Sequence, residues 1–258
     1  MNSLQRELVK YSKLAVAFSG GIDSMVLLAE AAALPDLQVL ALLAVGPTFP
    51  GAEQEDAVIF CRQRGIEWRE VAFNPLDIPE FRLNNLQRCY YCKLGMLRAL
   101  QQVAEAKGAV LVEGTNVDDD GDYRPGQQAL KELGIVSPLH QAGWGKKDIR
   151  RRAGELGLPA DKPSMACLVS RVAYGMTLNL GDLKRIDQAE QQLRALGFRQ
   201  VRLRLAGLNE YVAELDNGLE GCEFKLAVAV EEIVRSIFSR IEKLQIRPYR
   251  PGGSFNRL

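Results

Sequence analysis

The chain has little of several things that would point to common functions. It has a single histidine, His140, which follows Pro138-Leu139 without a partner motif, so we do not expect histidine catalysis. No apolar run approaches the ~20 residues that a membrane-spanning helix needs. Residues 1–11 are polar and charged and lack the apolar centre of a signal peptide. We therefore expect a cytoplasmic protein with no membrane partner.

An excess of charge of one sign is also missing. The 33 Lys and Arg residues balance 32 Asp and Glu residues, which leaves a net charge of +1. Proteins that bind long nucleic acids usually present a broad basic surface, so we expect no nucleic-acid partner, although a small basic patch fits within a neutral total. The 258 residues and 47% hydrophobic content suffice for one large globular domain or two smaller ones.

Short apolar runs alternate with helical segments in the first part of the sequence. This alternation predicts an α/β fold with a doubly wound parallel sheet. After about Pro163 the pattern changes to that of a smaller α+β domain, so we expect domains at 1–173 and 174–258. The predicted strands are 14–18, 39–45, 67–73, 109–113, 198–205 and 210–215, with another in the tail, 247–258; the predicted helices are 23–33, 53–64, 94–106, 180–196 and 224–244.

A glycine-containing loop lies between the first predicted strand and the first predicted helix. Such a position, beyond the carboxyl end of a strand, is where open α/β sheets bind ligands. Glycines let a phosphate approach the backbone, and the helix N-terminus offers free N–H groups. The loop lacks the Gly-Lys-Ser/Thr ending of a Walker loop and the G-x-G-x-x-G of a dinucleotide fold. Its residues are Ser19, Gly20, Gly21, Ile22, Asp23 and Ser24.

This loop resembles the SGGxDS signature of the PP-loop pyrophosphatases, which cleave ATP between the α and β phosphates and leave an adenylated substrate. The alternative is an ordinary strand-to-helix turn. Asp23 suits either a helix cap or a ligand of Mg²⁺. Asp118, Asp119 and Asp120 form an acidic loop that suits Mg²⁺ binding near ATP equally well as a plain surface loop.

The cysteines carry the second chemical signal. Cys89 and Cys92 form a C-x-x-C pair, and Cys167 is distant in sequence. A second C-x-x-C, which would favour structural zinc, is absent. Three cysteines can hold a [4Fe–4S] cluster with one iron open, and free cysteines can also simply pack. Lys162 and Arg171 near Cys167 would lower the pKa of its thiol and favour a nucleophile. Cys61 and Cys222 have no partner motif and are expected to be structural.

Several motifs together resemble the LarE family of ATP-dependent sulfur transferases, which help to build the nickel-pincer nucleotide cofactor. The resemblance covers nearly the whole chain. The motifs are Ser19 to Ser24, Arg88-Cys89-Tyr90-Tyr91-Cys92-Lys93, Gly114-Thr115-Asn116, Gly121-Asp122-Tyr123-Arg124-Pro125-Gly126, Lys162 to Arg171 followed by Tyr174-Gly175, and the ending Tyr249-Arg250 with Gly253-Ser254-Phe255-Asn256.

This resemblance implies a PP-loop fold of the adenine nucleotide alpha hydrolase-like type that uses ATP and Mg²⁺. The substrate would be a pyridinium biscarboxylate mononucleotide, whose carboxylate is adenylated and then converted to a thiocarboxylate. The resemblance also implies a homo-oligomer, a hexamer in this family. ATP would contact Ser19, Gly20, Gly21, Asp23, Ser24 and Gly114.

The family has two sulfur sources. One type sacrifices a single cysteine, here Cys167, and leaves dehydroalanine; the other holds a [4Fe–4S] cluster on three cysteines, here Cys89, Cys92 and Cys167, whose open iron carries sulfide. The presence of all three cysteines resembles the cluster type.

The second domain carries the implied substrate contacts. Arg202 and Arg204 alternate on one face of a predicted strand, and two guanidinium groups on one face suit a nucleotide phosphate. The resemblance adds Ser170, Arg171 and Glu190. The alternative for the charged residues is a solvated surface. Two other function classes fit the same motifs: a PP-loop tRNA thiolase, and a non-catalytic protein that binds a nucleotide or a cluster.

Overall fold

The computed structural model describes residues 1–121, 125–159, 167–216 and 223–249. The chain forms two compact units. The first consists of Met1–Ile78 and Cys89–Met165, and the second of Pro79–Arg88 and Ala166–Leu258. The sequence prediction divided the chain between residues 173 and 174 and did not foresee that a segment as early as 79–88 packs with the C-terminal residues. Backbone hydrogen bonds from Gly175 to Asn84 and from Leu178 to Arg82 hold that segment there.

The first unit is built on a sheet whose strands are all parallel, as predicted. Within the described residues the strand order is β3-β2-β1-β4. The chain therefore moves outward from β1 through β2 to β3 and then returns to the other side of β1. This reversal makes the β1–β4 neighbourhood the topological switch point of the sheet. The strands are β1 Lys13–Ala17, β2 Gln38–Val45, β3 Glu67–Ala72 and β4 Val110–Val112.

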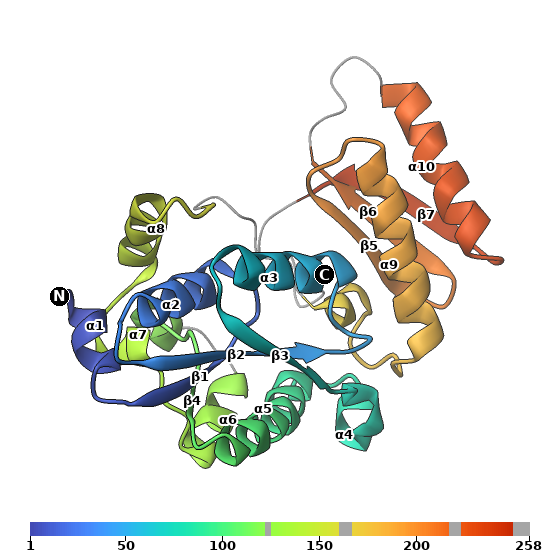
Figure 1. The fold of residues 1–258 in the computed structure, drawn as a ribbon. Helices are drawn as coiled ribbons and strands as arrows, with labels where there is room; N and C mark the ends of the chain where they lie inside the picture. The colour runs from blue at the N-terminus through green and yellow to red at the C-terminus, as the bar shows by residue number, and fades with distance from the viewer. Residues whose placement is uncertain (122–124, 160–166, 217–222, 250–258) are drawn as a thin grey trace. The chain divides into compact units, whose positions relative to one another are not determined.

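Helices cover both faces of this sheet (Figure 1). α5 and α6 lie on one face, and α1, α2, α3, α7 and α8 lie toward the other. No helix in the described part of the chain is long and apolar enough to cross a membrane. The helices are α1 Ser3–Leu8, α2 Ile22–Ala32, α3 Gly51–Gln63, α4 Pro79–Arg82 (which belongs to the second unit), α5 Arg88–Ala106, α6 Pro125–Leu133, α7 Pro138–Gln141 and α8 Lys146–Glu155.

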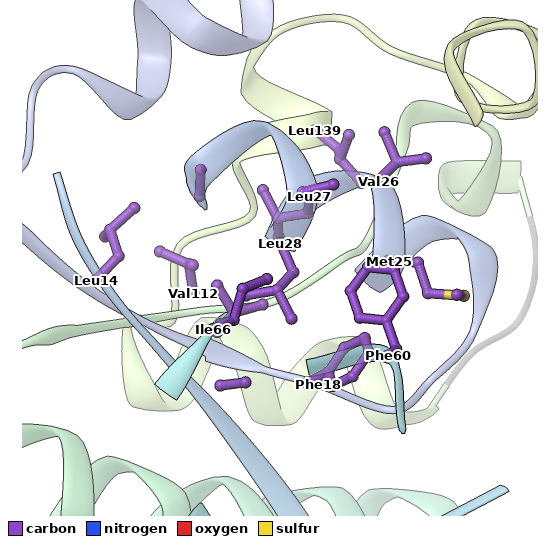
Figure 2. Packing of buried hydrophobic residues seen from close by; sticks show 14 of the residues in the cluster. Leu14, Phe18, Met25, Val26, Leu27, Leu28, Phe60, Ile66, Val112 and Leu139 are labelled. Atoms are coloured by element: carbon purple, nitrogen blue, oxygen red, sulfur yellow. The ribbon is translucent and has the colours of Figure 1, made fainter. Parts of the chain in front are cut away.

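The apolar strands supply side chains to two cores at once. Successive residues of a strand point to opposite faces, so Leu14 and Val16 enter the core under α2, whereas Ala15 enters the core under α5. Figure 2 shows the first of these cores, where Phe18 and Phe60 pack with ring centroids 5.4 Å apart. Burial on both faces explains why these strands are continuously apolar in sequence. The two cores fix β1 and, with it, the loop that follows.

The second unit is a small α+β structure, as predicted for the C-terminal part. Its sheet has the order β5-β6-β7 in the described residues, with β5 and β6 antiparallel and β6 and β7 parallel. The prediction of one helix over 224–244 was wrong, because α10 ends at Ile237 and residues 243–248 pair with β6 as a strand. The elements are α9 Leu180–Ala195, β5 Val201–Gly207, β6 Glu210–Leu215, α10 Glu223–Ile237 and β7 Lys243–Pro248.

Candidate functional site

The loop after β1 carries the predicted phosphate-binding residues. Gly20 has a φ of +71°, in the left-handed region that favours glycine, and a Cβ there would lie 3.3 Å from the Cβ of Ala57. Ser24 Oγ donates to the Gly21 carbonyl at 2.9 Å and lies 3.2 Å from Ser19 Oγ. Gly21 is the N-cap of α2 and has no side chain to cap it, so the first-turn N–H groups can bind an anion.

The loop after β4 packs against the same end of α2. A Cβ on Gly114 would lie 3.1 Å from the backbone nitrogen of Ser24, so a larger residue would fit only if the two segments moved slightly apart. Asn116 Nδ2 donates to Asp23 Oδ2 at 3.2 Å, which turns the Asp23 carboxylate toward the β4 loop. Because Gly21 occupies the N-cap position of α2 and Asp23 lies in its first turn, Asp23 is not the N-cap, one of the two roles considered for it. The two loops meet at the switch point of the sheet, where open α/β sheets bind their ligands.

Glu113, the residue directly after β4, is a buried carboxylate with several donors. It is 7% exposed and accepts hydrogen bonds from the Thr115 backbone nitrogen at 2.9 Å and the Thr115 hydroxyl at 2.8 Å. Ser137 Oγ also donates to it, and Lys93 Nζ lies 3.3 Å away. Glu113 was predicted only as the last residue of a strand over 109–113. The sequence feature that could have identified Glu113 as a site residue was its charge directly after an apolar strand, at the ligand-binding edge of the sheet.

The acidic loop that follows is engaged in local structure. Asp118 Oδ2 accepts from the backbone nitrogen of Lys146 at 2.6 Å. Asp119 Oδ2 accepts from the Asn116 backbone at 3.2 Å, and Asp120 lies 2.9 Å from His140 Nε2. These contacts favour the alternative in which the acidic residues stabilise the loop. They do not favour the alternative in which the three carboxylates bind Mg²⁺ together.

The cysteine pair lies in the first turns of α5, because this helix begins at Arg88 and not at residue 94. Cys89 is exposed and Cys92 is partly buried, and their spacing of three places both on one helix face. Cys167 belongs to the second unit, where it is partly buried and directly precedes a 3-10 helix, Leu168–Arg171. Among the residues that the structure describes, no group of three or more His, Cys, Asp or Glu side chains is placed to hold a metal ion. The structure therefore does not support the predicted cluster.

Glu190 is the centre of a buried ion-pair network in the second unit. Its side chain and that of Arg171 are both 0% exposed, and Arg171 binds it through two nitrogens at 2.8 and 3.0 Å. Arg194 Nη2 and the Leu203 backbone nitrogen also donate to Glu190, each at 2.9 Å. Arg171 further donates to Ser170 Oγ at 3.0 Å. A solvated surface was the alternative for Glu190, and this burial shows that alternative to be wrong.

Arg202 and Arg204 lie two residues apart in β5 and are 4% and 5% exposed, so a solvated surface is wrong for them as well. Arg204 Nε donates to Glu214 Oε2 at 2.8 Å, and its Nη1 donates to the Ser170 carbonyl at 3.0 Å. The Arg202 guanidinium lies 5.5 Å from the ring centroid of Tyr249. Burial lowers the pKa of Arg202. Both arginines remain candidate substrate contacts.

Comparison with known proteins decides the family. No protein-family model matches the chain. The chain is 34% identical over 195 residues to the pyridinium-3,5-bisthiocarboxylic acid mononucleotide synthase of Lactiplantibacillus plantarum, an alignment that covers 74% of this chain and 71% of that protein. The chain belongs to the LarE family. Two proteins named only as uncharacterized also match. One from Synechocystis is 39% identical over 73% of this chain and 71% of its own length, and one from Methanocaldococcus jannaschii is 30% identical over 89% of this chain and 86% of its own length.

Several motifs of the LarE resemblance meet in space within each unit. In the first unit, Gly114 and Asn116 contact the loop after β1, as described above. In the second unit, the Arg88 guanidinium lies 4.0 Å from the ring centroid of Tyr174. The LarE motif residues 122–124, 162–166 and 250–256 lie outside the described residues, as does Cys222.

Proposed function

We propose that this chain uses ATP to adenylate a carboxylate of pyridinium-3,5-biscarboxylic acid mononucleotide and then exchanges one oxygen of that carboxylate for sulfur. The relative from Lactiplantibacillus plantarum is named as the synthase of the corresponding bisthiocarboxylic acid mononucleotide, which supports this choice of substrate. One structural observation carries the ATP half of the proposal. The loops after β1 and β4 meet beside an α-helix N-terminus at the switch point of a parallel sheet.

The first-turn N–H groups of α2 would bind the phosphates of ATP, with Ser19, Gly20, Gly21, Ser24 and Gly114 around them. Mg²⁺ in nucleotide sites usually has one or two carboxylate ligands together with the phosphates. The partly exposed carboxylate of Asp23 fits that requirement, and the ion would supply charge neutralisation. A substrate carboxylate oxygen attacks the α-phosphorus, and pyrophosphate leaves. The product is an acyl adenylate whose leaving group is AMP, a far better leaving group than oxide.

The second unit would bind the nucleotide substrate through its buried arginines. Arg202 and Arg204 present guanidinium groups on one strand face, a geometry that suits a phosphate. The burial of Arg202 in a low-dielectric setting strengthens its attraction to an anion, whereas Arg204 already donates to the Glu214 carboxylate and would add a weaker attraction. Glu190 already receives Arg171 and Arg194, so its proposed role is to hold Arg171, and through it Ser170, in place for the substrate.

Cys167 is the proposed sulfur donor. Its thiolate attacks the acyl carbonyl, the C–S bond forms and AMP leaves. Removal of the Cys167 Cα proton then breaks the Cβ–S bond, which leaves dehydroalanine in the chain and a thiocarboxylate on the substrate. No oxidant is needed, since both electrons of the broken Cβ–S bond stay on sulfur.

A three-cysteine cluster is the second candidate for the sulfur source. The observation in its favour is that Cys89 and Cys92 occupy one face of α5. The first test is analysis of iron and sulfide in anaerobically purified protein, with mass spectrometry of the Cys167 peptide before and after turnover. A loss of about 34 Da, as H₂S leaves a cysteine, identifies Cys167 as the donor. About four irons per chain with an unchanged Cys167 would instead establish the cluster.

The proposed reaction itself is tested with purified protein, ATP, Mg²⁺ and the biscarboxylate mononucleotide under anaerobic conditions. We expect AMP and a substrate mass that reports exchange of oxygen for sulfur. Unfractionated tRNA serves as the alternative acceptor and should gain no sulfur. Absence of both AMP and the mass change would refute the proposed function.

A further inference from the structure

Lys93 has no role in the function proposed above, although specific contacts hold its side chain in place. It follows the cysteine pair in α5, and its ammonium lies 3.3 Å from the Glu113 carboxylate. Glu113 directly precedes Gly114, and the Gly114 backbone contacts the first turn of α2. The Lys93 ammonium is therefore held at the edge of the sheet that carries the proposed phosphate site.

We propose that Glu113 is a positioning residue that fixes the Lys93 ammonium for contact with the polyphosphate of ATP. This inference rests on the proposed function, because it assumes that ATP binds at the loops after β1 and β4. A cation contributes to phosphate binding through its charge, and a lysine side chain has many rotamers to lose before it can do so. A lysine held in place before ATP arrives avoids that entropic cost.

The structure restrains both ends of the Lys93 side chain. Glu113 holds the ammonium, and Glu113 is itself fixed by two donors from Thr115 and one from Ser137. The stem is restrained by α6, because a Cβ on Gly126 would lie 2.9 Å from Lys93 Cδ. Only 27% of the Lys93 side chain is exposed. A lysine that served only to keep α5 soluble would need neither restraint.

The sign of one variant's effect separates positioning from simple electrostatics. Glu113 is an anion near a site for an anionic ligand, so loss of its charge alone would make ATP bind more tightly. Loss of positioning would make ATP bind more weakly. Glu113→Gln keeps one carbonyl oxygen, which can accept from the Thr115 backbone nitrogen and the Ser137 hydroxyl as Oε1 does now. It replaces Oε2, the oxygen that faces Lys93, by an amide group and so removes the charge that holds the ammonium.

The test is calorimetric titration with α,β-methylene-ATP and Mg²⁺, a probe that cannot be cleaved between the α and β phosphates. We expect Glu113→Gln to raise the dissociation constant about five- to tenfold. Lys93→Met should raise it at least as much, and the Glu113→Gln, Lys93→Met double variant should bind no more weakly than Lys93→Met. Glu132→Gln is the matched control, since it removes an exposed carboxylate that accepts from Tyr90 and should leave binding unchanged.

A second variant guards against a folding defect of Glu113→Gln. Gly126→Ala pushes on the Lys93 stem and leaves the donors to Glu113 intact, so it should weaken binding and should have no effect in the Lys93→Met background. If Glu113→Gln binds the probe as tightly as the wild type or more tightly, the positioning role is overturned. It is also overturned if the loss of affinity in the double variant equals the sum of the losses in the two single variants. Failure of the wild type to bind the probe would instead overturn the proposed function, and the inference with it.

Discussion

Cys61 shows how a single residue's surroundings decide its reactivity. It lies in the core under α2 at 0% exposure, and burial raises the pKa of its thiol to about 11. Only the thiolate is nucleophilic, so Cys61 should be almost inert below pH 9. We expect iodoacetamide at pH 8 to label Cys89, which is exposed, and to spare Cys61, as measured by peptide mass spectrometry. Labelling in guanidinium chloride provides the control, and equal labelling of both residues in the native protein would contradict the burial argument.

Loss of Glu190 should greatly lower the stability of the second unit. Its removal would leave Arg171 charged at 0% exposure with its main partner gone, and breaking a buried pair in this way typically costs about 3–5 kcal/mol. Urea unfolding of Glu190→Ala measures this cost. Glu231→Ala, which removes an exposed partner of Arg235 in the same unit, should change the free energy of unfolding by less than about 0.5 kcal/mol. Similar losses of unfolding free energy in the two variants would show that the buried ion pairs stabilise the unit no more than the exposed pair does.

At the scale of single elements, α9 is capped at its N-terminus by Asn179, whose side-chain oxygen accepts from the Asp182 backbone nitrogen at 2.8 Å. Replacement of such a cap by alanine costs about 1 kcal/mol. Because α9 packs on β5, which carries Arg202 and Arg204, we expect Asn179→Ala to lower the stability of the second unit by this amount in urea unfolding. Gln191→Ala, on an exposed face of the same helix, is the comparison, and an equal loss there would argue against the cap.

The elements also show what the sequence could and could not predict. The apolar runs at 14–18 and 39–45 predicted β1 and β2 because strands that are buried on both faces are continuously apolar in the sequence. The prediction of a helix over 224–244 was wrong, since β7 exists only through pairing with β6, about thirty residues earlier. The start of α5 was placed six residues late for a related reason. Residues 88–93 have no strong apolar period, and contacts such as that of Gly126 with Lys93 are not local in sequence.

In the candidate site, too, the features that depend on neighbouring residues were predictable and those that depend on distant residues were not. The loop after β1 was predictable because strand, glycines and helix are contiguous in the sequence, and Figure 1 shows β1 leading into α2. Glu113 was not, because its donors come from three separate segments. The burial of Glu190 was missed because a charged residue on a helix is usually exposed, and only the tertiary partners Arg171 and Leu203 make burial tolerable.

For the whole molecule, the division into two units predicts where a nucleotide should act. The loops after β1 and β4 both belong to the first unit, each built on the sheet whose two cores fix β1. A ligand that binds only the folded state stabilises it by about 2.7 kcal/mol at a hundred times its dissociation constant. We therefore expect α,β-methylene-ATP to slow amide hydrogen exchange most strongly in peptides that contain 13–32 and 110–116.

The control for this prediction is Gly114→Val, because any side chain at this position meets the Ser24 backbone at 3.1 Å and should displace the β4 loop from α2. The nucleotide should then protect neither peptide, while exchange in β5 and β6 without nucleotide stays as in the wild type. The strongest protection in residues 201–215 would place the nucleotide on the second unit, and the loops after β1 and β4 would lose their assigned role. Protection centred on the first unit would support the proposal that the nucleotide binds at the switch point of the sheet, between β1 and β4.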